Sequence, residues 1–361
     1  MPARKFIQSL LLSGVRVRRF AAKCNNMLLQ PKHPADYRTL FWVYVLAPGV
    51  IALQFWKPTL LPYLCWVSAF LAVTCGIIAH NHNHKPTFAD KSDNRVFGNI
   101  LSVFYGYPVF GWIPTHNLNH HRYVNRPGDA TITWRLTRKH TFVVAITYFF
   151  VSSYYQATPI GEYISKAKEK AKTGNSELWD RIRMQYAVTF GGHAALLATA
   201  IALHGVKLGL VTWFFACGLP SGIALWSLML FNYEQHVNMD PFSKYDHSRN
   251  FTSPVLNFLL FGNGYHAVHH DFPNMHWSEY AAEHKKIAHL MAPDTNQPTI
   301  WWYWFKQYAL APLVPAWGTK QVGPGPWTDK ADLATASVDA VEAGNNAERL
   351  VNESGALVAA E

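Results

Sequence analysis

The sequence predicts an all-α integral membrane protein with two transmembrane helical hairpins, about four spans, and a cytoplasmic helical cap that carries clustered histidines. Three observations lead to this fold class. Half of the 361 residues are apolar and only 15% are charged. In soluble domains, about a quarter of all residues are charged. Four uncharged stretches have nearly the length of one bilayer crossing: residues 40–56, 59–79, 185–203 and 208–231. Histidines gather directly after the second and the fourth of these stretches.

The first segment, residues 1–39, is basic, with Asp36 as its single acid. Basic residues beside a membrane span are typical of a cytoplasmic juxtamembrane segment. This segment could form an amphipathic helix on the membrane or a free basic tail. The net charge of +10 could indicate a nucleic-acid partner, but the basic residues flank apolar spans. We therefore expect contacts with anionic membrane lipid and with an acidic protein partner, and none with nucleic acid.

Short links join the four apolar stretches in pairs and predict the two hairpins. Only Lys57 and Pro58 separate the first two stretches, and residues 204–207 separate the last two. The first turn is poor in positive charge, as an outer loop should be. His193 lies inside the third stretch, where we expect a hydrogen bond between helices rather than a functional role.

The segments between and after the hairpins are predicted to lie at the membrane surface or outside it. Residues 96–112 are broken by Gly and Pro and are typical of an interfacial or re-entrant segment. Residues 141–157 must lie in the interface, or dip into the membrane and return, because the histidine clusters can meet only if an even number of crossings separates them. Together, residues 40–317 form the predicted catalytic domain. We expect residues 318–361 to be a disordered tail that can be removed without loss of activity.

Four short stretches of the sequence carry histidines at the spacing of metal ligands. His266, His269 and His270 lie three and four residues apart, which places them on one face of a helix. His80 and His84 lie four apart, and so do Asn232 and His236. The remaining stretch, HNLNHH, contains His116, His120 and His121.

Nine imidazoles are too many for one ion and fit two. His120 and His121 are adjacent and diverge by about 100° on a helix, so they could serve different ions. His82 lies on the opposite helix face from His80 and His84, and we expect it outside the ligand set. Zinc is disfavoured because its sites use four ligands, often with cysteine, or one open site. The Glu-x-x-His pairs of soluble di-iron bundles are missing from the sequence.

These stretches resemble the three histidine boxes of the integral-membrane fatty acid desaturase superfamily. HNHNH resembles the first box, HNLNHH the second and GYHAVHHDFP the third. The resemblance also matches His236 to the histidine before the third box, and Asn232 to a residue near one iron. It implies two non-haem irons, O₂ as co-substrate and a fatty acid or acyl lipid as substrate. It implies a separate electron donor of ferredoxin, rubredoxin or cytochrome b5 type, and a site on the cytoplasmic side of a bacterial inner membrane.

The ligands leave the outcome of the oxidation open. Removal of two hydrogens would give a double bond, which is the predicted reaction, and oxygen rebound would give an alcohol. The stretch NYEQH also resembles alkane hydroxylases, with Gln235 where those enzymes carry Glu. A third outcome is decarboxylation of a free fatty acid to a terminal alkene. A histidine-rich metal transporter is a remote alternative, because its ligands would lie at mid-bilayer.

A long alkyl chain must reach the metals from the membrane, so the two helices that carry the first and last ligands are expected to line a substrate tunnel. Burial of each CH₂ is worth about 0.8 kcal/mol, and tunnel depth can therefore select chain length. The expected lining residues are Trp66, Phe70, Cys75, Trp213, Gly222 and Trp226.

Overall fold

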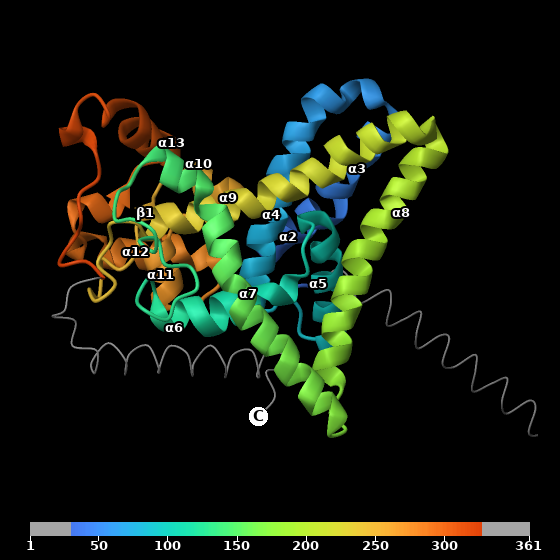
Figure 1. Cartoon of the computed structure of the whole chain (residues 1–361), viewed down its shortest axis with the longest axis horizontal. Helices are drawn as coiled ribbons and strands as arrows, with labels where there is room; N and C mark the ends of the chain where they lie inside the picture. Colours follow the sequence, from blue (N-terminus) through green and yellow to red (C-terminus); the bar gives the residue numbers. More distant parts are fainter. Residues whose placement is uncertain (1–29, 327–361) are drawn as a thin grey trace, which may run out of the picture.

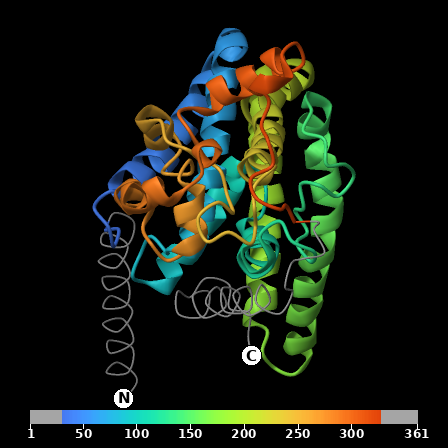
Figure 2. The ribbon, with the colours of Figure 1, turned by 90° about the vertical axis from the view of Figure 1, so that its left-hand side faces the viewer.

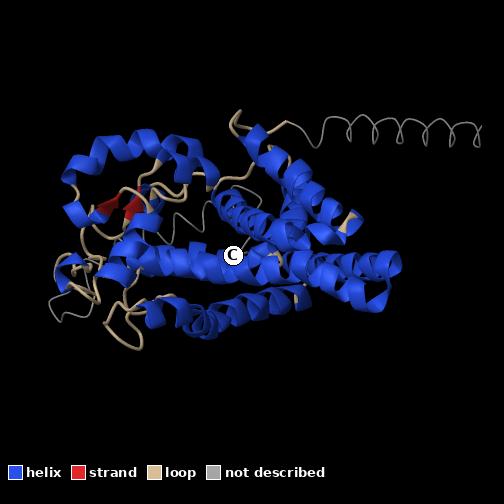
Figure 3. Ribbon diagram, turned by 90° about the horizontal axis from the view of Figure 1, so that it is seen from above, coloured by secondary structure: helices blue, strands red, loops and turns tan. Residues whose placement is uncertain are grey.

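The computed structural model describes residues 30–326, and this part of the chain is almost entirely helical. One pair of two-residue parallel strands, β1 (Asn250–Phe251) and β2 (Asn296–Gln297), lies at one end of the molecule (Figure 3). The mostly helical fold predicted from composition is confirmed.

The first apolar stretches form two long helical segments. One runs without a break through α2 (Asp36–Phe41), the π-helical η1 (Trp42–Leu46) and α3 (Ala47–Trp56). Lys57 leaves helical geometry at φ −134°. The chain then re-enters a helix through η2 (Pro58–Leu60) and α4 (Leu61–His84), because proline is favourable in a first turn.

The next helices are joined by a sharp bend. Asp90 caps α5 (Lys91–Tyr105) by accepting a hydrogen bond from the Ser92 amide. Gly106, at φ 84°, ends the helix in the left-handed region that favours glycine. The chain continues through η3 (Val109–Gly111), the π-helical η4 (Ile113–His120) and α6 (His121–Tyr123), at 98° to α5.

The longest helices follow. Thr141 caps α7 (Phe142–Lys172), which packs beside the first part of α8 (Glu177–Trp213) as shown in Figure 2. The α8 helix is broken at Gly205, with φ 73° and ψ 170°, and the chain turns back there (Figure 1). It continues through η5 (Phe214–Gly218) into α9 (Leu219–His236).

Short helices complete the end of the molecule that holds the histidines. They are α10 (Pro254–Leu259), α11 (His266–Asp271), η6 (Trp277–Glu279), α12 (Tyr280–Ile287), η7 (Ala288–Leu290), η8 (Pro293–Thr295), α13 (Ile300–Trp304), η9 (Phe305–Leu310) and η10 (Pro315–Trp317).

The core lies around α4, which packs against α9, α5 and α3. Gly76 makes the close approach possible, because a Cβ there would lie 2.5 Å from Cδ1 of Leu228 and 2.8 Å from the Tyr105 ring. This packing brings the C-terminal ends of α4 and α9 together, and both ends carry histidines.

Three helical segments of residues 30–326 are long and apolar enough to cross a membrane: Asp36–Trp56, Pro58–His84 and Glu177–His236. The bent pair of Lys91–Tyr105 and Val109–Tyr123 would make a fourth. The third segment contains both stretches predicted as the second hairpin. His193 makes the predicted interhelical hydrogen bond, from its Nε2 to the Val103 carbonyl at 3.0 Å.

The two predicted terminal segments lie mostly outside the described residues, which exclude 1–29 and 327–361. The start of the predicted tail is nevertheless bonded to the body. Thr319 Oγ1 interacts with His140 Nδ1 at 2.8 Å and accepts from Asn238 at 3.1 Å, and the Val322 amide donates to the Asn238 carbonyl.

We therefore expect the position of a C-terminal truncation to matter. A chain that ends at residue 326 keeps these contacts and should melt like the full chain. A chain that ends at residue 317 loses them and should be less stable by about 1–3 kcal/mol, because buried polar partners are left unpaired. Thermal unfolding of the two truncations in detergent tests this, and equal melting would contradict it.

Candidate metal centre

Two groups of buried histidines lie at the C-terminal ends of α4 and α9. Within each group, every histidine places one ring nitrogen within 4.8 Å of a ring nitrogen of every other member. The first group is His80, His84, His116, His121 and His269, and the second is His120, His236, His266 and His270. The structure thus brings together all nine histidines predicted from spacing.

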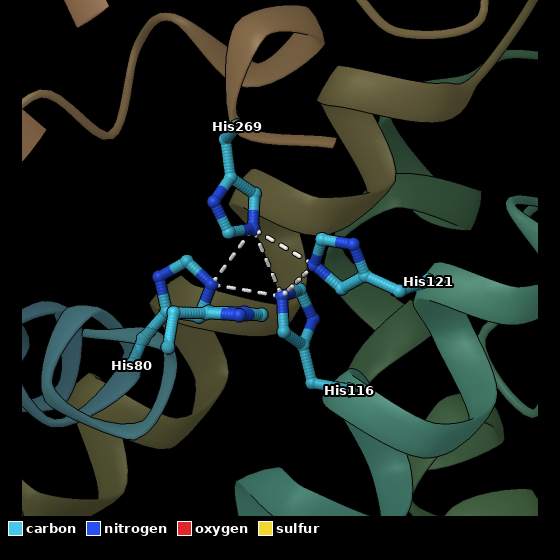
Figure 4. A group of neighbouring side chains, drawn as sticks. His80, His116, His121 and His269 are labelled. Atoms are coloured by element: carbon cyan, nitrogen blue, oxygen red, sulfur yellow. Dashed lines mark hydrogen bonds between the residues drawn. The ribbon is translucent and has the colours of Figure 1, made fainter. Parts of the chain in front are cut away.

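The first group draws its members from four elements. His80 and His84 come from the C-terminal end of α4, His116 from η4, His121 from α6 and His269 from α11. The rings of His80, His116, His121 and His269 point toward one another (Figure 4). The Nε2 atom of His269 lies 3.0 Å from that of His80, 3.1 Å from that of His116 and 3.0 Å from that of His121.

These distances suit a shared cation better than a hydrogen-bond network. The Nε2 atoms of His80, His116 and His269 are mutually 2.8–3.1 Å apart. A ring nitrogen of neutral imidazole either donates or accepts and cannot do both, so these three pairs cannot all be hydrogen bonds. An ion about 2.1 Å from each nitrogen spaces two ligands at right angles by about 3 Å. Neither ring nitrogen of the buried His84 has a hydrogen-bond partner within residues 30–326, which leaves both available.

The second group is as compact as the first. The Nε2 of His236, on α9, lies 3.0 Å from that of His120, 2.9 Å from that of His266 and 3.3 Å from that of His270. The groups adjoin, since the ring centroids of His121 and His270 are 4.5 Å apart. Burial lowers the pKa of His266, His269 and His270 well below the usual value, and repulsion between the clustered imidazoles adds to this. They are therefore neutral at physiological pH, the form that binds metals.

The π-helical geometry of η4 decides which histidine joins which group. In a π-helix residues are linked five apart rather than four, and the His121 amide accordingly donates to the His116 carbonyl. His116 and His121 therefore face the same group, at 3.0 Å between their Nε2 atoms. His120 turns to the other group. The predicted divergence of His120 and His121 agrees with this placement.

Side chains behind the histidines fix their orientation. Asp129 Oδ2 accepts a hydrogen bond from Nδ1 of His120 at 2.8 Å, and Thr131 Oγ1 donates to Asp129 Oδ1 at 2.7 Å. Burial raises the pKa of Asp129, but the adjacent His120 and the Thr131 hydrogen bonds outweigh it and lower that pKa to about 2. The ionised carboxylate holds the proton on Nδ1, so the Nε2 lone pair of His120 faces the group.

Two hydroxyls contact other members of the groups in the same way. Tyr280 OH lies 3.3 Å from Nδ1 of His269, and Ser248 Oγ lies 3.4 Å from Nδ1 of His236. Sequence reasoning missed Asp129, Ser248 and Tyr280. Each is separated from its histidine by 9 to 12 residues, and no helical spacing relates them.

Two residues discussed from the sequence lie beside the groups. His82 is buried but points away, with Nδ1 3.0 Å from Thr87 Oγ1 and Nε2 3.3 Å from the Asn94 carbonyl. Asn232 lies one turn before His236, and its amide donates to Tyr148 OH at 3.2 Å. It also lines a cavity with His80, His116 and His266. Its predicted role as a metal ligand stays a prediction.

This cavity, of about 480 Å³ including its open mouth, corrects the predicted tunnel lining. Both helices that were expected to line the tunnel, α4 and α9, contribute side chains to this cavity, but none of the six expected residues lines it. Trp66 is 66% exposed, and Trp226 donates its indole hydrogen to the Ile146 carbonyl. The apolar lining residues are Ile77, Trp112, Leu228, Met229 and Phe231, and the polar ones besides histidine are Thr115, Thr131, Gln156, Asn232, Gln235 and Asn263.

The comparisons with known proteins give one match. A family model described as "Fatty acid desaturase" matches residues 55–304, more than two thirds of the chain, and this range contains every histidine of both groups. No curated protein and no solved structure matches.

Proposed function

We propose, because this chain belongs to the fatty acid desaturase family, that it is a membrane non-haem di-iron oxidase that removes hydrogen from a fatty acyl chain. The metal-dependent, desaturase-like character follows from the family and the histidine groups. Desaturation is the reaction that we propose first. It consumes O₂ and the two hydrogens of the substrate, with two protons and two electrons from a separate donor, and yields a double bond and two waters.

The observation that carries the proposal is the pair of adjoining, buried histidine groups whose ring nitrogens face one another. The first group would hold one iron, and the second group, with Asn232 nearby, the other. Imidazole suits several transition metals, so the choice of iron rests on the family. Bound there, two irons supply the reductive activation of O₂ that C–H attack requires.

The residues of the chain have separate roles in this proposal. Asp129, Ser248 and Tyr280 orient the imidazoles that they contact. The walls contributed by α4 and α9 bind the acyl chain next to His80 and His266. Burial of both groups excludes bulk water from the reaction.

A second candidate reaction is favoured by the polarity of the cavity. Four amides and two threonines line it close to the histidines. Some of their donors bond within the protein, such as Gln235 Nε2 to the Asn263 carbonyl and Thr115 Oγ1 to the Gly111 carbonyl. Each amide has more than one donor and acceptor position, and a mid-chain methylene segment can pair with none of those that remain. A substrate with its polar end beside the metals would pair with them. That placement supports attack near the carboxyl end of a free acid, by hydroxylation or by decarboxylation to a terminal alkene.

One product analysis separates the candidates. Gas chromatography with mass spectrometry of lipids and headspace is applied to cells that express the protein and are fed fatty acids of different lengths. A new internal double bond supports desaturation, whereas a hydroxy acid or a volatile alkene supports the second candidate. Cells with the His269→Ala variant are the control. If no oxidised product depends on His269, the proposed function is wrong.

We expect the cavity wall to set the preferred chain length. Met229 lines the cavity and is flexible enough to be replaced. Met229→Ala should shift the preference toward longer acids, at about 0.8 kcal/mol for each additional buried CH₂. Trp66→Ala is the matched control, because Trp66 is exposed on α4 away from the cavity. The product distribution from a mixture of acids measures the shift. A shift with Trp66→Ala and none with Met229→Ala would overturn this assignment.

A further inference from the structure

The α7 helix packs against α9 close to the histidine-bearing end of α9 (Figure 1). Two polar side chains meet at this contact, Tyr148 of α7, which is 3% exposed, and Asn232 of α9. Asn232 precedes His236 by four residues, so both side chains lie on the same face of α9. The contact therefore joins a tyrosine outside the nine histidines to the edge of the second group.

The hydroxyl group of Tyr148 makes two hydrogen bonds, and the first fixes the direction of the second. It donates its proton to the Thr131 backbone carbonyl, which can only accept. A phenol is neutral near pH 7 and carries one proton, so toward Asn232 the Tyr148 oxygen can only accept. The Asn232 atom that lies 3.2 Å from this oxygen is accordingly the donor Nδ2.

The oxygen of the Asn232 amide is thereby turned toward the cavity. An amide that directs Nδ2 at Tyr148 directs Oδ1 away from it, and Asn232 lines the cavity together with His266 of the second group. Within residues 30–326, Nδ2 makes the one hydrogen bond of this side chain. The second group contains four histidines and the first contains five. An amide oxygen, which can bind metal ions, would give the second group a fifth donor.

We propose that Tyr148 is a positioning residue for the second histidine group, because its hydroxyl holds Asn232 with Oδ1 facing the metal ion of that group. This inference rests on the proposed function, which places one ion in each group. Without the hydroxyl, the amide can turn over and present Nδ2, which donates hydrogen bonds and offers no lone pair to a metal. Tyr148 thus acts on Asn232, whereas Asp129 acts on the ring of His120.

Metal titration of the purified full-length protein, freed of metal and kept under argon, tests this role. The probe is Co²⁺, with visible absorption reporting its ligands and metal analysis giving the ions bound per chain. The unsubstituted protein should bind two ions. Tyr148→Phe should keep the first ion and weaken binding of the second about tenfold or more, as expected when a residue that positions a ligand is lost.

Tyr233→Phe is the matched control for the loss of a buried hydroxyl. The Tyr233 ring lies 5.0 Å from that of Tyr148 between centroids, but its hydroxyl has no hydrogen-bond partner in the described part of the chain. This variant should bind both ions as tightly as the unsubstituted protein. Loss of the second ion in both variants would show that packing between α7 and α9 is being measured, and would overturn the role of the Tyr148 hydroxyl.

A change at Asn232 separates positioning from a general structural effect of Tyr148. Asn232→Asp places an oxygen at both ends of the side chain, so either orientation presents an oxygen to the metal. Adding Tyr148→Phe to Asn232→Asp should therefore not weaken binding of the second ion further. A defect in folding, or one transmitted through Thr131 to His120, would persist in that background.

The proposal is overturned if Tyr148→Phe weakens binding equally with and without Asn232→Asp, or in neither case. If Tyr148→Phe fails to fold, Asn232→Leu decides, because it lacks the oxygen and should lose the second ion selectively. Two tightly bound ions in that variant would overturn the proposal. The titration requires neither O₂ nor substrate, so an unsubstituted protein that binds two ions but oxidises no fatty acid would contradict the proposed function and leave the role of Tyr148 standing.

Discussion

Replacing His269 by alanine should abolish oxidation of the fatty acyl substrate and remove about one metal ion per chain. His269 Nε2 lies within 3.1 Å of the Nε2 atoms of His80, His116 and His121, so it stands at the centre of the first group together with His116. Loss of a residue that only hydrogen-bonds to a metal ligand lowers metal affinity by about 10–100-fold. Loss of the ligand itself should lower the affinity at least as much. Iron analysis and product formation, measured on the same preparation, check both effects.

His82→Ala is the matched control for this prediction. His82 is a buried histidine of the same sequence cluster, but it bonds to Thr87 and Asn94 and belongs to neither group. The variant should keep its metal and most of its activity. Equal losses in the two variants would show that general destabilisation is being measured, and full activity of His269→Ala would remove His269 from the site.

The second large effect is expected for Asp129→Asn, which should empty the second group while leaving the first group occupied. An asparagine can donate to Nδ1 of His120, which would move the ring proton to Nε2 and direct it into the group. The affinity of the second group for iron should fall by about 10–100-fold. Iron content should drop toward one per chain at limiting iron and recover when excess iron is supplied.

Asp36→Asn tests whether the effect is specific to the carboxylate behind a group member. Asp36 accepts from His276 Nε2 at 3.1 Å, and His276 is in neither group. This variant should retain both ions. An Asp129→Asn protein with unchanged iron affinity would mean that the carboxylate does not determine the tautomer of His120.

The histidine groups could be predicted from the sequence because their members are encoded locally. Spacings of three and four residues place His266, His269 and His270 on one helix face, and His80 and His84 likewise, whatever the rest of the fold does. The assignment of His116 to the group of His121 could not be predicted, because it depends on the π-helical geometry of η4, and the sequence carries no clear signal for it.

The residues that orient the histidines and the residues that line the cavity are brought into place by packing between segments that are distant in sequence. Asp129 reaches His120 only because the loop after α6 folds back. Trp66 and Trp226 were expected in the tunnel since they are bulky and lie on the correct helices, but hydropathy alone does not show which face of a fully apolar helix meets its neighbour. The close contact at Gly76 determines that face.

The most direct test of two adjoining metal sites is the metal content of the purified full-length protein after expression with both iron and zinc supplied. Inductively coupled plasma mass spectrometry, with protein concentration from amino-acid analysis, gives the ratio of each metal to the chain. The two histidine groups predict about two metal ions per chain, and the proposed function predicts that these ions are iron, with little zinc. A protein that is active with one metal ion per chain, or that contains zinc in place of iron, would contradict the di-iron assignment.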